Sequence, residues 1–149
     1  MTPKFELLKE AYAILGGIPS KVINLNSIQE KEGKALSCGT ICCGIGWLGH
    51  HPKFQALGLK TKENGVSYKG EDSYYEDAAS NLFNIDYKSA EELFAPGYDI
   101  CNSLEKGASP LLSHKQRLLY RFRTYLRRHG QLKHQLAKKA RKELDVQAI

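Results

Sequence analysis

Apolar residues recur every three or four positions in several stretches of this chain, which is the spacing of amphipathic helices. In the first stretch, Phe5, Leu8, Tyr12 and Leu15 fall on one side of a helix that ends at Gly16-Gly17. The stretches for which the same pattern predicts helices are residues 3–15, 41–49, 73–84, 89–94 and 110–130, with one more helix beyond Gly130.

Signals for extended structure are few. Asn64-Gly65 is the strongest turn signal in the chain, so we expect a small β-hairpin over about residues 58–69. The apolar patch Val22 to Leu25 is either a short strand or an extended segment. The pattern therefore predicts a mainly α-helical domain of five or six helices with at most a small hairpin.

The stretch from Ser37 to His51 differs from its surroundings, because it holds three of the four cysteines, the only tryptophan and four glycines. Three glycines inside a short helix would each cost about 1 kcal/mol relative to alanine unless neighbouring backbone comes close to them. We therefore expect a buried central helix with Thr40 as its N-cap. The residues expected to form this structural core are Cys38, Thr40, Cys43, Gly46 and Trp47.

The same stretch reads Cys38-Gly39-Thr40-x-x-Cys43-x-x-Gly46-Trp47, and in this it resembles a family of small uncharacterised phage and bacterial proteins. The resemblance continues through Ala78 to Ile85 and Leu93 to Pro96, with Asn84 where the family usually has glycine. It implies a phage-borne gene. The family has no known activity, so the resemblance implies no catalytic residues.

Length and composition favour one globular domain. The chain has 149 residues, 42% of them hydrophobic and 26% charged, which is enough for one core without disulfide support. No apolar run approaches the length of a membrane span, and the first residues contain no secretory signal. We therefore expect no membrane partner, a cytoplasmic location and reduced thiols.

Charge is distributed unevenly along the chain. Eleven Lys/Arg and two acidic residues follow residue 110, a net charge of +9, whereas eleven Lys/Arg and fourteen acidic residues precede it, a net charge of −3. This asymmetry predicts a helical core domain over residues 1–109 and a basic helical arm over residues 110–149.

The basic arm is the main functional candidate, since arginine forks interleaved with tyrosines are suited to phosphates and bases. We expect a non-enzymatic protein that binds nucleic acid with little sequence specificity, or else docks on an acidic protein surface as an inhibitor or assembly factor. A plain solvated helix face is the third interpretation of the arm. The predicted binding residues are Lys115, Arg117, Tyr120, Arg121, Arg123, Tyr125, Arg127, Arg128, Lys133, Lys138 and Lys139.

Cysteine chemistry supplies two further hypotheses. Cys38 before a helix N-terminus, with His50 as a base, could serve as a thiol nucleophile. Cys38, Cys43 and His50, with Cys101 as a distant fourth ligand, could bind a metal, although their spacing lacks the paired cysteines of structural zinc sites. We expect no cofactor, and the sequence does not fix an oligomeric state.

Overall fold

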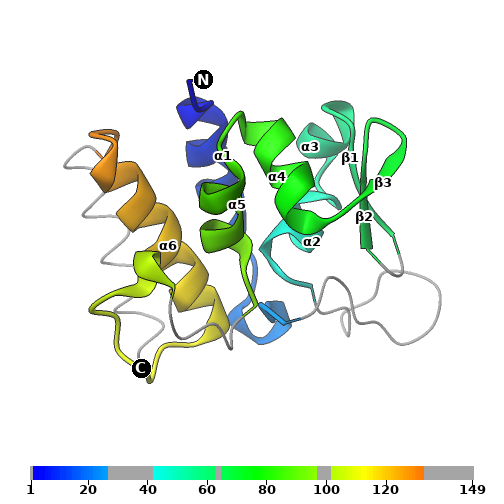
Figure 1. Ribbon diagram of the computed structural model, residues 1–149. Helices are drawn as coiled ribbons and strands as arrows, with labels where there is room; N and C mark the ends of the chain where they lie inside the picture. Colours follow the sequence, from blue (N-terminus) through cyan, green and yellow to red (C-terminus); the bar gives the residue numbers. More distant parts are fainter. Residues whose placement is uncertain (1, 27–41, 63–64, 97–101, 133–149) are drawn as a thin grey trace.

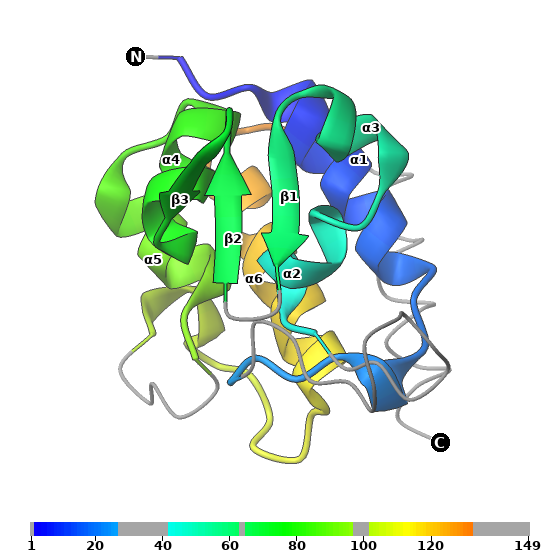
Figure 2. The same ribbon diagram turned by 90° about the vertical axis from the view of Figure 1, so that its right-hand side faces the viewer.

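The computed structural model describes residues 2–26, 42–62, 65–96 and 102–132, in which helices surround a core and a small sheet covers one side (Figures 1 and 2). The helical elements in chain order are α1 (Phe5–Gly16), η1 (Ser20–Val22), α2 (Gly44–Leu48), α3 (Pro52–Ala56), α4 (Tyr75–Phe83), α5 (Tyr87–Phe94), η2 (Ser103–Glu105) and α6 (His114–Arg128). The strands are β1 (Leu59–Lys62), β2 (Gly65–Tyr68) and β3 (Glu71–Ser73).

The mainly α prediction is confirmed, and so is the hairpin. Strands β1 and β2 pair antiparallel with Leu59 opposite Tyr68 and Lys62 opposite Gly65. The sequence pattern missed β3, which pairs antiparallel with β2. The sequence of this strand is Glu-Asp-Ser, and none of these residues is buried. It therefore lacks the alternation of apolar and polar residues from which a strand can be predicted.

Two helix starts differ from the sequence prediction because a different residue caps the helix. Helix α6 begins at His114 rather than at residue 110, since Ser113 and Gln116 form a reciprocal capping box. Helix α5 begins two residues before Ser89, because the Asp86 carboxylate accepts a hydrogen bond of 2.9 Å from the Ser89 backbone N–H.

The core lies between α1, α4, α5 and α6, and its aromatic rings connect these helices. The rings of Phe83 and Phe94 stack at 6.1 Å, and the rings of Phe94 and Phe122 meet edge to face at 5.6 Å. The ring of Tyr12 on α1 lies 6.5 Å from the ring of Phe122, between centroids. Helix α6 thus belongs to the same hydrophobic cluster as α1 and α5.

Helix α2 begins at Gly44 with Cys43 as N-cap, three residues later than expected. The expected cap Thr40 and the core residue Cys38 lie outside the residues that the structure describes. Gly46 is buried, and the half-buried Trp47 donates from its indole N–H to the Val22 carbonyl at 2.9 Å. The α2 segment therefore packs against the chain near η1.

Gly44 of α2 and the C-cap residue Gly49 stand close to other elements. The close neighbour includes backbone, as the sequence predicted, at Gly49, whereas at Gly44 it is side chains. A Cβ on Gly49 would lie 2.1 Å from the Thr61 Oγ1 atom and 2.7 Å from its backbone nitrogen. A Cβ on Gly44 would lie 3.0 Å from the Leu118 side chain. Glycine at these positions lets β1 and α6 approach α2 directly.

Among the described helices, none is both long and apolar enough to cross a membrane.

Candidate nucleic-acid interface

Helix α6 carries cations on its inner as well as its outer side. Its apolar residues Leu118, Leu119, Phe122 and Leu126 are at most 1% exposed, as the apolar periodicity predicted. Arg121 shares this inner side and is 0% exposed. Contrary to the expectation from the sequence, Arg121 is not available to a phosphate on the surface.

Arg121 instead connects three elements inside the protein. Its Nε donates to Glu105 Oε1 at 3.0 Å, and its Nη1 donates to the carbonyls of Leu93 at 3.3 Å and Ala95 at 2.8 Å. These carbonyls belong to the end of α5, where backbone acceptors have no partner within the helix. The Arg121 guanidinium therefore fixes η2 and the end of α5 against α6.

Glu105 is the anion at the centre of this network. Arg117 forms a bidentate pair with it, with Nε–Oε1 and Nη2–Oε2 distances of 2.9 Å each. Burial alone would raise the pKa of the Glu105 carboxyl, but the hydrogen bond from Arg117 and the charge of Arg121 hold that pKa below its ordinary value. The carboxylate consequently remains ionised and neutralises part of the arginine charge.

Lys115, Arg123 and Tyr125 are the other predicted binding residues that the fold turns inward, at 4–7% exposed. The Lys115 ammonium donates to the Gly16 carbonyl at 2.8 Å. The Arg123 guanidinium lies over the Tyr120 ring, 5.1 Å from its centroid. These three residues of the predicted set therefore support the helix packing, and Lys115 and Arg123 contribute their charge from below the surface.

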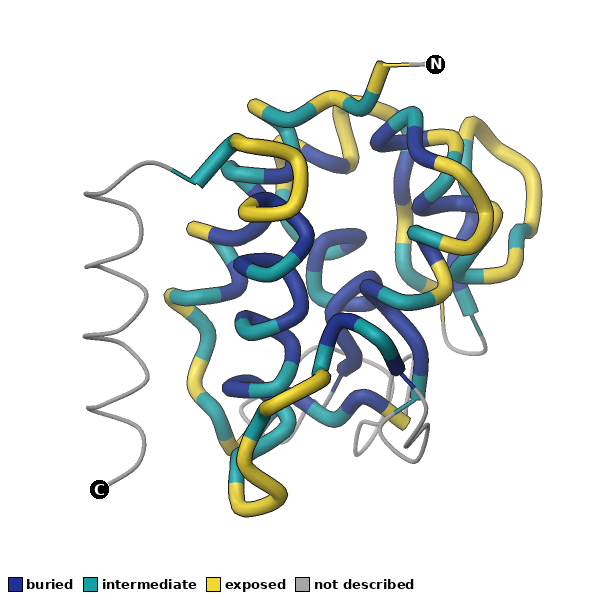
Figure 3. The backbone as a smooth tube through the Cα atoms, turned by 60° about the vertical axis from the view of Figure 1, so that its left-hand side comes forward, coloured by how far each residue is buried: buried dark blue, intermediate teal, exposed yellow. Residues whose placement is uncertain are grey.

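The outer side of α6 and the adjoining η2 loop hold the accessible cations. Arg127 and Arg128 are exposed at the end of α6, and Lys106 is exposed directly after η2. Figure 3 colours the described backbone by burial, with exposed segments in yellow. Arg128 donates to the Ser103 carbonyl at 3.0 Å, and the Tyr120 hydroxyl donates to the Lys106 carbonyl at 3.1 Å. We call the set Lys106, Tyr120, Arg127 and Arg128 the α6 surface.

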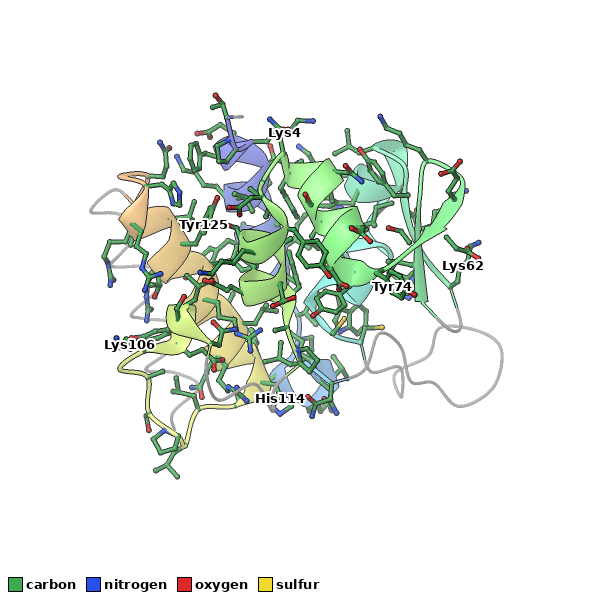
Figure 4. All side chains as sticks on the ribbon, viewed as in Figure 1. Lys4, Lys62, Tyr74, Lys106, His114 and Tyr125 are labelled. Atoms are coloured by element: carbon green, nitrogen blue, oxygen red, sulfur yellow. The ribbon has the colours of Figure 1, made fainter. Side chains whose placement is uncertain are left out.

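The region of the α6 surface is strongly positive. Six cations other than Lys115 lie between residues 106 and 128, and two of them pair with Glu105. When Glu105 and Glu92, which accepts a hydrogen bond from Ser103 of η2, are both counted, this region has a net charge of +4. Lys106 lies on this side of the molecule, whereas Tyr74 lies on the side of the sheet (Figure 4). The carboxylates of the chain therefore do not fully neutralise the cations around α6.

A hollow of about 780 Å³ opens beside the start of α6, and Lys106, His114 and Arg117 are among its lining residues. The His114 Nδ1 accepts a hydrogen bond of 2.8 Å from the Leu25 backbone N–H, so the ring proton is on Nε2. Burial, and then the charges of Arg117 and Arg121, lower the pKa of His114, which keeps the ring neutral. The hollow is therefore lined by two cations, Lys106 and Arg117, and by one neutral hydrogen-bond donor, the Nε2–H of His114.

Sequence reasoning missed Glu105 and Lys106, which lie in a loop without periodic pattern. One signal was present: Glu105 is the only acidic residue between Asp99 and Glu143, just before a run of arginines. A lone carboxylate in that position is suited to be an internal counter-ion. The predicted binding residues Lys133, Lys138 and Lys139 lie outside the described residues.

The thiol and metal hypotheses depend in part on Cys38 and Cys101, which also lie outside the described residues. Cys43 is buried, and this burial raises the pKa of its thiol to about 11, so it is a poor nucleophile and a poor metal ligand at neutral pH. His50 is half-buried against Trp47, with ring centroids 6.1 Å apart. Within the described part of the chain, no three His, Cys, Asp or Glu side chains are arranged to hold a metal ion.

Comparisons with protein-family models, with curated proteins and with solved structures found no match to this chain. The resemblance to the phage and bacterial family therefore stays a prediction from the motif.

Proposed function

We propose that this protein binds nucleic acid, without marked sequence specificity, through the α6 surface and the basic residues that follow it. The observation that carries the proposal is the net charge of +4 around α6 and η2, with Arg127 and Arg128 exposed. A phosphate backbone is the most common extended anion that such a surface meets inside a cell.

The arginines of α6 would have two different roles, one structural and one in binding. Arg117 and Arg121, paired with Glu105, hold η2 against α6 and so position Lys106 next to Tyr120. Arg127 and Arg128 are exposed and would pair with phosphates, although Arg128 also donates one hydrogen bond to the Ser103 carbonyl. The Tyr120 ring, partly exposed and backed by Arg123, offers a face on which a base could stack.

The acidic side of the molecule would orient the protein on its ligand. Glu71 and Asp72 belong to β3, and Glu76 and Asp77 belong to the first turn of α4. Strand β3 lies across the molecule from α6 (Figures 1 and 2). Phosphates are repelled there and attracted at α6, so one face would approach the nucleic acid.

A matched pair of charge reversals tests this proposal. Arg127→Glu with Arg128→Glu should weaken binding to a labelled oligonucleotide at least about tenfold at low salt, because each reversal removes one phosphate contact and adds a repulsion. Lys60→Glu with Lys69→Glu makes the same change in net charge at the sheet and should leave binding within about twofold. Fluorescence anisotropy measures both, and an equal loss in the two variants would contradict a defined interface.

A second candidate function is docking of a basic protein segment on the acidic side. Tyr74 and Tyr87 are 75% and 50% exposed there, and the Tyr87 hydroxyl donates to Glu76 Oε1 at 2.8 Å. That hydrogen bond, followed by burial and by neighbouring carboxylates, raises the pKa of Tyr87 to about 12. Exposed rings beside carboxylates are suited to lysine and arginine side chains. Tyr74→Ala with Tyr87→Ala should abolish binding of a lysine-rich peptide. An unchanged affinity for the peptide would contradict this second function.

The setting that we propose is the cytoplasm of a bacterial cell, with a phage-borne gene. The motif of residues 38–47 and the free, buried thiol of Cys43 support it. A role of the α2 segment as the central packing element, rather than as a reactive site, is part of the same proposal.

A further inference from the structure

The hollow of about 780 Å³ beside the start of α6 has the size of a small-molecule site, which is roughly 300–1,000 Å³. Its lining comes from two parts of the chain. Residues of η2 and of the following loop, Lys106 and Ser109 among them, face His114 and Arg117 on α6. Lys106 is also a member of the α6 surface, so the hollow adjoins that surface.

The hollow is positive although Glu105 is one of its lining residues. The Glu105 carboxylate already accepts three hydrogen bonds, two from Arg117 and one from Arg121. Arg121 is 0% exposed, so its charge acts from the interior. Lys106, Arg117 and Arg121 outnumber the carboxylates by three to two even when Glu92, which is hydrogen-bonded to η2, is counted with Glu105. An anion that enters the hollow therefore meets an excess of positive charge.

Three lining side chains can donate hydrogen bonds to such an anion. Arg117 gives two of its five N–H groups to Glu105, which leaves three among the described contacts. The His114 ring accepts a backbone N–H on Nδ1 and therefore carries a neutral N–H on Nε2. The Ser109 hydroxyl oxygen accepts a backbone N–H at 3.2 Å, and its own hydrogen can donate. This set is suited to a ligand with several charged oxygens.

A terminal phosphate suits the hollow better than a phosphate inside a strand. A phosphomonoester carries about 1.5 to 2 negative charges at pH 7 and three acceptor oxygens. It has a single substituent and can enter a hollow, whereas a phosphate inside a strand has backbone on both sides. Lining residues Ala108, Pro110 and Leu112 add apolar surface, against which the face of a base can lie.

We propose that this hollow binds the phosphomonoester of a nucleotide, either at the end of a nucleic-acid strand or in a free nucleotide. For the strand end, the inference rests on the proposed function, because the rest of the strand would continue over the α6 surface. Arg117 and Arg127 are about 15 Å apart along α6, which corresponds to about four nucleotides at about 3.4 Å each. A phosphate held in the hollow would therefore fix the position of the strand on the α6 surface.

The ratio of two affinities tests this inference. One oligonucleotide, with a fluorophore at one end and either a phosphate or a hydroxyl at the other, should bind the wild type about tenfold more tightly when it is phosphorylated. Ser109→Glu places a carboxylate in the hollow and should reduce this ratio to about one. Leu111→Glu makes the same change in charge on a side chain that is 91% exposed and does not line the hollow, and it should keep the ratio. Circular dichroism verifies that both variants are folded.

A second measurement uses the wild type alone. Adenosine 5′-monophosphate should shift the NMR signals of the His114 ring, whereas adenosine should not. An affinity for this nucleotide equal to that for the phosphorylated oligonucleotide would identify a free nucleotide as the ligand, and a much lower affinity would identify the strand end.

Two results would overturn the inference and leave the proposed function intact. The first is equal affinity for the phosphorylated and the unphosphorylated oligonucleotide together with no response of His114 to the nucleotide. The second is a preference for the phosphorylated form that persists in Ser109→Glu, since the phosphate would then bind elsewhere. A phosphorylated peptide that binds as tightly as the oligonucleotide would overturn the assignment to a nucleotide. A response of His114 to the nucleotide without any binding of oligonucleotide would contradict the proposed function alone.

Discussion

Replacing Glu105 by glutamine should destabilise the protein far more than a single neutralised carboxylate on the surface would. The substitution keeps the shape of the side chain and removes its charge. Three hydrogen bonds to arginine depend on this carboxylate, two from Arg117 and one from Arg121. The glutamine amide would also direct N–H groups toward guanidinium N–H groups, which cannot accept them.

The expected magnitude follows from the burial of the partners. Removing one partner of a buried ion pair costs about 3–5 kcal/mol, because the other charge stays behind without compensation. Arg121 is 0% exposed, whereas Arg117 and Glu105 retain 20% and 12%. Partial solvent access to this pair favours the lower end, about 3 kcal/mol of lost unfolding free energy.

Urea unfolding at pH 7, followed by circular dichroism and extrapolated linearly to water, measures this loss. Glu6→Gln is the matched control, since Glu6 pairs with Lys9 at 3.0 Å but its side chain is 84% exposed. That control should lose less than about 0.5 kcal/mol. A loss below about 1 kcal/mol in Glu105→Gln would refute the view that this network is buried and holds η2 to α6.

Three further predictions follow from particular contacts. The folded state lowers the pKa of Glu105 below its ordinary 4.5, so the ionised carboxylate stabilises the fold above that pH. The unfolding free energy of the wild type should therefore fall as the pH drops below 4.5. In the same urea titrations, Glu105→Gln should show a smaller fall between about pH 5 and pH 3. Gly49→Ala should lose about 2 kcal/mol in thermal or urea unfolding because its Cβ meets Thr61 backbone, whereas Gly65→Ala, with open space around it, should lose less than about 0.5 kcal/mol. With Cys38 and Cys101 replaced by serine, a thiol reagent at pH 8 should label the buried Cys42 and Cys43 only after denaturant is added, and rapid labelling of the native protein would show that these thiols are accessible.

The sequence predicted best what is encoded locally. The end of α4 is an example: the pattern predicts a helix that ends at residue 84, and Asn84 closes α4 in the left-handed conformation with φ 54° and ψ 47°. The antiparallel pair of β1 and β2 likewise needed only a turn signal and the flanking pattern. Both features depend on neighbours within a few residues.

Features that depend on distant partners could not be predicted in this way. Arg121 looks like a surface cation on a basic helix, and its partners Glu105, Leu93 and Ala95 lie 16 to 28 residues earlier. No periodicity connects these positions, so their meeting is a property of the packed fold. Charge alone therefore assigns the candidate interface to α6, while the side on which each cation lies needed the structure.

The central claim is that the positive region around α6 neutralises phosphates. The most direct measurement is the dependence of oligonucleotide affinity on salt, over about 50 to 300 mM, for the wild type and for Arg127→Glu/Arg128→Glu. The claim predicts that log K falls linearly with log salt, and that the double variant reduces the slope by about 2. An affinity that does not change with salt, or that is absent at the lowest salt, would contradict it.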